Sequence, residues 1–159
     1  MTSDASFRPY LQLHSTRPRQ ATAPALTELS LTALQARLRR RELRASDLVE
    51  AHIAQIQTVN PLINAVVIDR FAAAREEAKA ADARLQAATD PSTLPPLLGI
   101  PCTVKEFFAV AGQPQTGGMV AYRDRRPAAD STVVERLKSA GAILVGLTNV
   151  PEGGMWMET

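Results

Sequence analysis

Cysteine and histidine are scarce in this sequence of 159 residues. The single cysteine, Cys102, excludes an internal disulfide and a cysteine-based zinc cluster, and the two histidines, His14 and His52, lie far apart without ligand spacing. No apolar run approaches the ~18 residues that a membrane-spanning helix needs. Residues 1–9 also lack the layout of a signal peptide. We therefore expect a soluble, cytoplasmic protein with no membrane span, no bound metal and no cofactor.

Glycine is absent from the first 98 residues, and all eight glycines lie at or after Gly99. Glycine-free sequence favours helices, whereas scattered glycines are typical of tight turns between strands and helices. The composition, 45% hydrophobic and 21% charged, suits a soluble protein, and the length suits about one domain with a sizeable core. The sequence thus predicts a helical first part followed by an α/β second part.

The excess of one charge is small, because 18 basic residues oppose 16 acidic ones and leave a formal net charge of +2. The basic residues form one cluster, which consists of Arg37, Arg39, Arg40, Arg41 and Arg44. A surface that binds single-stranded nucleic acid would need aromatic partners, and none lie nearby. We interpret the cluster as a solvated helix face and expect no nucleic-acid partner.

Apolar periodicity and capping residues predict three helices and one strand before Gly99. Residues 1–28 have scattered prolines and no apolar period, so they are expected to form a flexible N-terminal arm. The predicted elements are a helix over residues 31–43 with Ser30 as cap, a helix from the cap Ser46 to the Asn60-Pro61 pair, a strand over 63–68 and an Asp69-capped helix over 70–88.

The glycine-containing part predicts the beginning of a sheet. The predicted elements are strands over residues 100–105 and 142–147, a turn-rich connection over 112–118 and a helix over 133–140. Pro101 argues either for an edge position of the first strand or for a place as the first residue of that strand. The helix has a capping box of Thr132 and Glu135, and Gly141 suits its C-terminal cap. The continuous apolar run at 142–147 is typical of a strand buried on both faces in a parallel sheet.

Two features after Gly99 are candidates for a catalytic or binding role: a lysine at the end of a predicted strand and a glycine-containing turn. Lys105 ends an apolar strand; the pattern alone favours an exposed lysine, whereas burial would favour a neutral amine that can accept a proton. The Thr116-Gly117-Gly118 segment is either a turn that needs positive φ or a place where backbone N–H groups approach a ligand.

A third candidate group follows the second strand, at the edge where open α/β sheets bind ligands. It contains Thr148, Asn149 and Glu152. An asparagine at this place either caps a helix or fixes a loop beside a site. The apolar residues at 155–157 either line a pocket or fill the core.

Several segments match one known family in order and spacing. They are Leu98-Gly-Ile-Pro-Cys-Thr-Val-Lys-Glu106, Gly112, Thr116-Gly117-Gly118, residues 130–137, residues 140–146 and Thr148-Asn-Val-Pro-Glu152, preceded by helical segments at 31–34, 47–50 and 60–65. Together they resemble the N-terminal part of the amidase signature family, the amide-bond hydrolases with a Ser–cis-Ser–Lys triad. The resemblance covers residues 29–159. It implies an α/β fold in which N-terminal helices precede the start of a mixed or parallel sheet flanked by helices.

The resemblance also implies roles for single residues. Lys105 matches the catalytic lysine, which in its neutral form takes a proton through a bridging serine while a second serine attacks the amide carbonyl. Because the neutral form requires burial, we expect Lys105 to be buried. The substrate, a small-molecule amide, would bind at Thr148, Asn149, Gly154 and Met155. The family permits a homodimer, and its chemistry needs no cofactor and no metal.

The sequence departs from the family pattern after residue 152. A Gly-Gly-Ser-Ser-Gly segment with the bridging serine should come after residues 148–152, and the nucleophile further on. The sequence ends at Thr159, and only Ser131 and Ser139 lie beyond Lys105. We therefore expect residues 29–159 to be an incomplete amidase domain, inactive alone, with an exposed strand edge and uncovered apolar surface.

The choice among activities rests on short stretches of sequence. The Lys105-Glu106 pair and the Asn-Val-Pro-Glu-Gly-Gly-Met text at 149–155 favour the hydrolases that act on hydrophobic or fatty amides. Two alternatives stay open. One is a subunit of a glutamine amidotransferase of the same family, which releases ammonia for a partner enzyme, and the other is a non-catalytic binding module.

Overall fold

The structure, a computed structural model, describes residues 25–157. Of the predicted arm, residues 1–24 lie outside the described part of the chain. The end of the arm differs from the prediction, because Leu26–Glu28 form a short 3-10 helix, η2. Leu26 and Leu29 pack against the core, and the burial of their side chains holds this segment on the fold.

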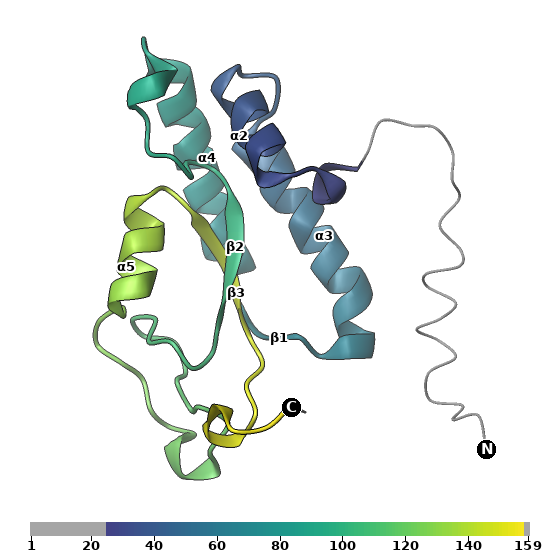
Figure 1. The fold of residues 1–159 in the computed structure, drawn as a ribbon, viewed down its shortest axis with the longest axis vertical. Helices are drawn as coiled ribbons and strands as arrows, with labels where there is room; N and C mark the ends of the chain where they lie inside the picture. The colour runs from purple at the N-terminus through teal and green to yellow at the C-terminus, as the bar shows by residue number, and fades with distance from the viewer. Residues whose placement is uncertain (1–24, 158–159) are drawn as a thin grey trace, which may run out of the picture.

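Three strands form a mixed sheet in the order β1-β3-β2 (Figure 1). The central strand, β3 (Ile143–Thr148), pairs parallel with β2 (Pro101–Lys105) and antiparallel with β1 (Val66–Asp69). The predicted burial of the apolar run is confirmed, since β3 is buried from Ile143 to Leu147. Pro101 begins β2, an edge strand of this sheet, where a missing N–H costs least, as predicted.

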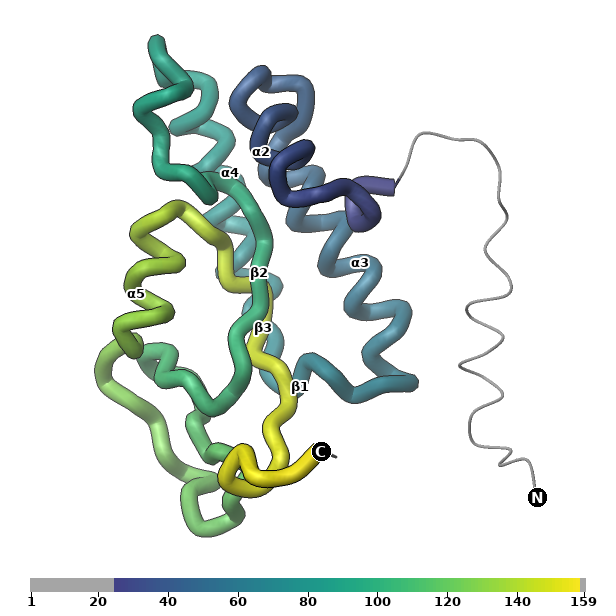
Figure 2. Tube along the Cα trace, viewed as in Figure 1, coloured from purple at the N-terminus to yellow at the C-terminus, as the bar shows by residue number. Residues whose placement is uncertain are grey.

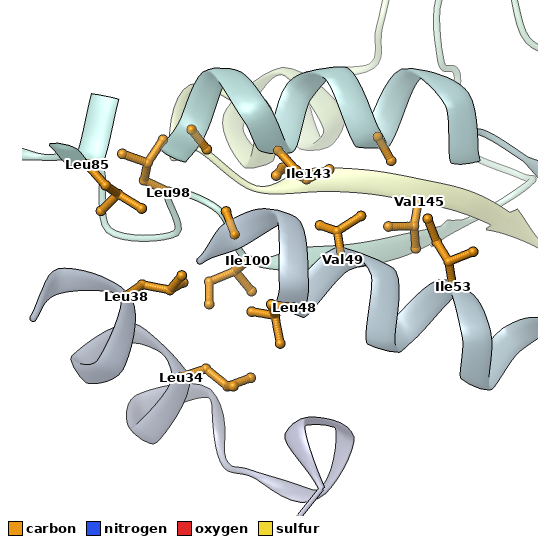
Figure 3. Packing of buried hydrophobic residues seen from close by; sticks show 14 residues of the cluster. Leu34, Leu38, Leu48, Val49, Ile53, Leu85, Leu98, Ile100, Ile143 and Val145 are labelled. Carbon is orange, nitrogen blue, oxygen red and sulfur yellow. The ribbon is translucent and has the colours of Figure 1, made fainter. Parts of the chain in front are cut away.

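Helices cover both faces of the sheet, as the sequence predicts. They are α2 (Leu31–Arg39), α3 (Ala45–Ile63) and α4 (Phe71–Ala87) on one face and α5 (Thr132–Ser139) on the other. On the first face, Val49 and Ile53 of α3 lie beside Val145 of β3, and Leu48 lies on the side of α3 nearer to Leu34 of α2 (Figure 3). On the second face, Val134 of α5 packs with Leu147. Among the helices of residues 25–157, none combines the length and apolar character that crossing a bilayer requires.

The arginine cluster lies where α2 ends, and part of it is structural. The helix ends at Arg39, four residues before its predicted end, and Arg41 adopts a positive φ of 59°. The Arg41 guanidinium donates to the carbonyls of Leu85 and Ala88 at 3.1 and 2.6 Å, at the end of α4. Arg39 donates to carbonyls in the loop at residues 91–94. These two side chains tie the end of α2 to the end of α4 and to the loop that follows it, so the cluster is not simply a solvated face.

The predicted cap of α3, Ser46, is replaced by a residue from another helix. Asp82 of α4 accepts hydrogen bonds from the backbone N–H groups of Ala45 and Ser46 at 2.6 and 3.1 Å. The hydroxyl of Ser46 also donates to Asp82, at 2.5 Å. The first turn of α3 is therefore capped through tertiary structure.

The other end of α3 also differs from the prediction. The helix runs through the Asn60-Pro61 pair and ends at Ile63, followed by Asn64 with a φ of +46°. Asn60 uses its side chain elsewhere: its amide donates to the Val66 carbonyl and accepts from the Val66 N–H, both at 2.8 Å. This contact fixes the start of β1 at Val66 rather than at residue 63.

Two further predicted caps do not act as caps. The residues before α4 and α5 are Arg70 and Ser131, and neither side chain makes a capping hydrogen bond to the first turn of its helix. Asp69 instead ends β1 within its pairing with β3, and Thr132 is already helical. Gly141 does follow α5 with a φ of +91°, as predicted.

Candidate functional site

The carboxyl ends of β2 and β3 meet at one edge of the sheet. Lys105, the last residue of β2, is in register with Thr148, the last residue of β3. The backbone N–H of Glu106 extends this pairing by donating to the Thr148 carbonyl at 2.8 Å. Asn149 comes directly after β3, and its N–H donates to the Ala65 carbonyl at 2.8 Å. The structure therefore brings together Lys105, Thr148 and Asn149, three of the predicted site residues.

Lys105 is exposed in the described structure, which contradicts its expected burial. Its neighbour Val104 is buried in the cluster under α5. Since side chains alternate along a strand, Lys105 projects from the opposite face. β2 lies at an edge of this sheet, and residues 25–157 leave the end of that face open to solvent. The described residues therefore do not by themselves provide the buried lysine that the resemblance leads us to expect.

Glu106, next to Lys105, has a buried structural role that its sequence pattern did not predict. Only 3% of it is exposed, and its carboxylate accepts hydrogen bonds from the N–H groups of Thr116 and Gly117, the latter at 2.9 Å. The Gly118 N–H donates to the Thr116 hydroxyl at 3.1 Å. All three N–H groups of the turn are thus engaged within the protein, which favours the structural interpretation of the Thr116-Gly117-Gly118 segment.

The turn needs its two glycines for different reasons. Gly117 and Gly118 have φ values of +60° and +75°, which glycine adopts without a steric penalty. A Cβ on Gly118 would lie 2.8 Å from the backbone of Val150 and Pro151. The Gly153 N–H donates to the Gly117 carbonyl at 2.8 Å. The turn therefore packs directly against the segment after β3, near the carboxyl edge of the sheet (Figure 2).

The segment after β3 contains the remaining predicted site residues. Glu152–Gly154 form a 3-10 turn, η5, in which Gly154 has a φ of +70°. Asn149 caps no helix; its side-chain oxygen accepts from the Val150 N–H at 3.0 Å and fixes the loop. Met155 and the next two residues are strongly exposed, with 85% of Met155 accessible. Within the described residues, positions 155–157 therefore do not fill the core.

Two hollows flank this edge of the sheet. One of about 250 Å³ is lined by Glu106, Asn149, Val67, Ile68, Pro114, Thr116, Gly118 and Val150. The other, of about 230 Å³, is lined by Phe107, Gln115, Thr116, Gly117, Met119, Tyr122 and Arg125. Lys105 lines neither hollow. The walls of both combine apolar side chains with a few polar groups, as small-molecule sites do.

Cys102 adds no activated nucleophile to this edge, and the described acidic residues add no metal site. Burial raises the pKa of the Cys102 thiol, and the charge of Glu77 adds to the effect, so the thiol stays protonated at neutral pH. Within the part of the chain that the structure describes, no group of three or more His, Cys, Asp or Glu side chains could hold a metal ion.

Comparison with known proteins gives a consistent result. A family model described as Amidase matches residues 47–159. The chain is 43% identical over 149 residues to fatty-acid amide hydrolase 2 of Homo sapiens, which covers 91% of this chain and 28% of that protein. It is 42% identical over 135 residues to a glutamyl-tRNA(Gln) amidotransferase subunit of Nitratidesulfovibrio vulgaris, covering 85% of this chain and 27% of that protein.

Solved structures agree in fold. A bacterial aryl acylamidase of the amidase signature family superposes with a TM-score of 0.71 at 31% identity, over 79% of this chain and 26% of that one. A fatty acid amide hydrolase superposes with a TM-score of 0.76 at 21% identity, over 90% of this chain and 24% of that one, which shows the fold alone. The chain spans about a quarter of the length of the curated relatives that it matches.

Proposed function

The chain belongs to the amidase family, and we propose on this basis that it carries the catalytic lysine, Lys105, of an amide hydrolase with a Ser–cis-Ser–Lys triad. The observation that carries the proposal is the position of Lys105. It lies within the matched residues 47–159 and ends β2 in register with Thr148, at the edge where α/β sheets place their ligands.

In this proposal Lys105 moves protons. Its neutral amine accepts a proton through a bridging serine while a nucleophilic serine attacks the amide carbonyl. Lys105 returns this proton through the bridging serine to the leaving nitrogen as the C–N bond breaks and the acyl-enzyme ester forms. Water then hydrolyses the ester, which releases the acid and restores the serine hydroxyl. Because Lys105 is exposed in residues 25–157, we propose that further polypeptide covers this edge and stabilises the neutral amine.

The proposal assigns oxyanion stabilisation to groups outside the glycine turn. An oxyanion needs preorganised N–H donors. The N–H groups of Thr116 and Gly117 already donate to Glu106, and that of Gly118 donates to the Thr116 hydroxyl. These donors are occupied, so other backbone N–H groups would have to supply this function.

We propose further that residues 1–159 alone do not hydrolyse amides. Only Ser131 and Ser139 lie beyond Lys105 in the sequence. Ser131 directly precedes α5 and Ser139 ends it, so neither lies in a glycine turn. The test is the release of aniline from a simple anilide by the purified chain. Turnover that Lys105→Ala abolishes, and that the exposed-lysine control Lys79→Ala keeps, would contradict the proposed inactivity.

For the substrate class we propose a hydrophobic amide, bound beside Thr148, Asn149, Gly154 and Met155. The exposed apolar side chains near the site support this, since 47% of Phe107 and 71% of Trp156 are accessible. A relative 43% identical to the chain is named a fatty-acid amide hydrolase. A small-molecule amide of this class needs an apolar wall for its acyl part.

The second candidate is an amidotransferase subunit, which the 42% identity to a glutamyl-tRNA(Gln) amidotransferase subunit favours. Two measurements on the protein isolated from its source cells separate the candidates. Ammonia release from glutamine and co-purification of partner subunits support the amidotransferase. Hydrolysis of a long-chain primary amide without partner subunits supports the hydrolase.

A further inference from the structure

Glu106 is the one buried charged residue among residues 25–157, with 3% of its surface exposed. A buried carboxylate is costly unless hydrogen bonds compensate for the lost water. Here the compensation comes from two backbone N–H groups, those of Thr116 and Gly117. Hydrogen bonds to a charged acceptor are stronger than neutral ones. The contact therefore anchors the glycine turn firmly to the residue after Lys105.

The anchored turn also holds a second segment. The Gly117 carbonyl accepts a hydrogen bond from the Gly153 N–H at 2.8 Å. Gly118 lies so close to the backbone of Val150 and Pro151 that a Cβ would meet it at 2.8 Å. A continuous path thus leads from Glu106 through the turn to η5, the 3-10 turn at Glu152–Gly154.

At its other end the path is fixed to the sheet. The Glu106 N–H donates to the Thr148 carbonyl at 2.8 Å, so the backbone beside Lys105 is held by the last pair of the parallel ladder. Glu106 therefore contacts the glycine turn through its carboxylate and the end of β3 through its backbone N–H. No other described side chain combines burial, charge and this double anchorage.

We infer that Glu106 is a positioning residue that fixes η5, and with it Gly154 and Met155, relative to Lys105. The inference rests on the proposed function, which gives Lys105 the catalytic role and Gly154 and Met155 the substrate. Glu106 touches neither the substrate nor the reacting atoms in this account. It acts through the glycine turn.

The test is amide hydrogen exchange, followed by NMR on the 159-residue chain, for wild type and Glu106→Gln. The amide side chain keeps the shape of Glu106 but replaces one acceptor with a donor that opposes a backbone N–H. We expect exchange at Thr116, Gly117 and Gly153 to become at least about tenfold faster, because each of these N–H groups depends on the anchored turn. Exchange at Ile143, which lies in β3, should stay unchanged.

Two further variants make the pattern specific. Glu135→Gln removes an exposed carboxylate on α5 and should leave all four rates unchanged. Glu106→Asp keeps the charged acceptor and should recover part of the protection at Gly153. Unchanged exchange at Gly153 in Glu106→Gln would overturn the inference. Equal acceleration at Gly153 and Ile143 would also overturn it, since that pattern reports general loss of stability rather than positioning.

The wild-type chain provides a measurement that does not depend on a variant folding. Thr116, Gly117 and Gly153 should exchange as one unit, with the same dependence on denaturant and separately from Ile143. Independent exchange of Gly153 would contradict the inference. Neither measurement uses turnover, so a failure here is distinguishable from a failure of the proposed amidase function.

Discussion

Two glycines of this chain allow the cost of a close backbone approach to be measured separately from the cost of a positive φ. Gly118 and Gly112 have φ values of +75° and +72°. A Cβ on Gly118 would lie 2.8 Å from the Val150 and Pro151 backbone, whereas a Cβ on Gly112 would meet nothing within 4 Å. The variants Gly118→Ala and Gly112→Ala therefore share the backbone penalty and differ in the contact.

The expected magnitudes depend on these two costs. A left-handed conformation costs alanine about 1–2 kcal/mol, which is the whole expected loss for Gly112→Ala. The contact at Gly118 adds about 1–3 kcal/mol, because the backbone of residues 150–151 must shift to admit the methyl group. Gly118→Ala should thus lose roughly 2–5 kcal/mol of unfolding free energy.

Urea unfolding followed by circular dichroism measures the difference. With a slope of about 2 kcal/mol per molar urea, the midpoint of Gly118→Ala should lie roughly 0.5–1.5 M below that of Gly112→Ala. Equal midpoints would refute the reasoning, since they would mean that the turn does not pack tightly against the segment after β3.

Two more predictions concern contacts away from the site. Asp82→Ala should lower the unfolding free energy by about 2–4 kcal/mol, because the N–H groups of Ala45 and Ser46 lose their capping carboxylate. Ser46→Ala should lower it by only about 0.5–1.5 kcal/mol. Urea unfolding of both variants tests this order, and a larger loss for Ser46→Ala would mean that Ser46 is the cap. Burial raises the pKa of Asp130, but hydrogen bonds from Lys138 and the Ala111 N–H, with the nearby positive charges, outweigh it and hold the pKa below its ordinary value. A carboxyl with a lowered pKa stabilises the fold above its unfolded pKa and loses this effect as the pH falls through the folded value. The stability gap between wild type and Lys138→Met should therefore be widest above the unfolded pKa of Asp130 and should narrow as the pH falls through its lowered folded pKa, and a gap independent of pH would contradict the ion pair.

The elements that the sequence predicts well are those that local pattern determines. The apolar run of β3 had to be buried on both faces wherever the chain placed it, and Pro101 could lie only at an edge or strand start. Gly141 likewise meets the local need for a positive φ after α5. The family resemblance, carried by the order of many segments, is confirmed by the match over residues 47–159.

The features that differ from prediction depend on contacts distant in sequence. Ser46 has the chemistry of a cap, but the carboxylate that caps α3 comes from Asp82, 36 residues away. The exposure of Lys105 depends on what covers β2, which no local pattern reveals. The role of Glu106 could have been suspected only from the Thr116-Gly117-Gly118 turn, because the N–H groups of Thr116 and Gly117 need an acceptor. The cytoplasmic location and the homodimer stay predictions.

The central claim is that this chain contributes Lys105 to an amide hydrolase. The most direct measurement is amide hydrolysis by the protein as its source cell produces it, compared with its Lys105→Ala variant and with the Lys79→Ala control. Loss of a general base lowers the rate by about 10²–10⁴-fold, so we predict a fall of that size for Lys105→Ala and none for Lys79→Ala. Activity of Lys105→Ala within about twofold of the unsubstituted protein would contradict the account, because a proton-transfer role cannot be removed at so small a cost.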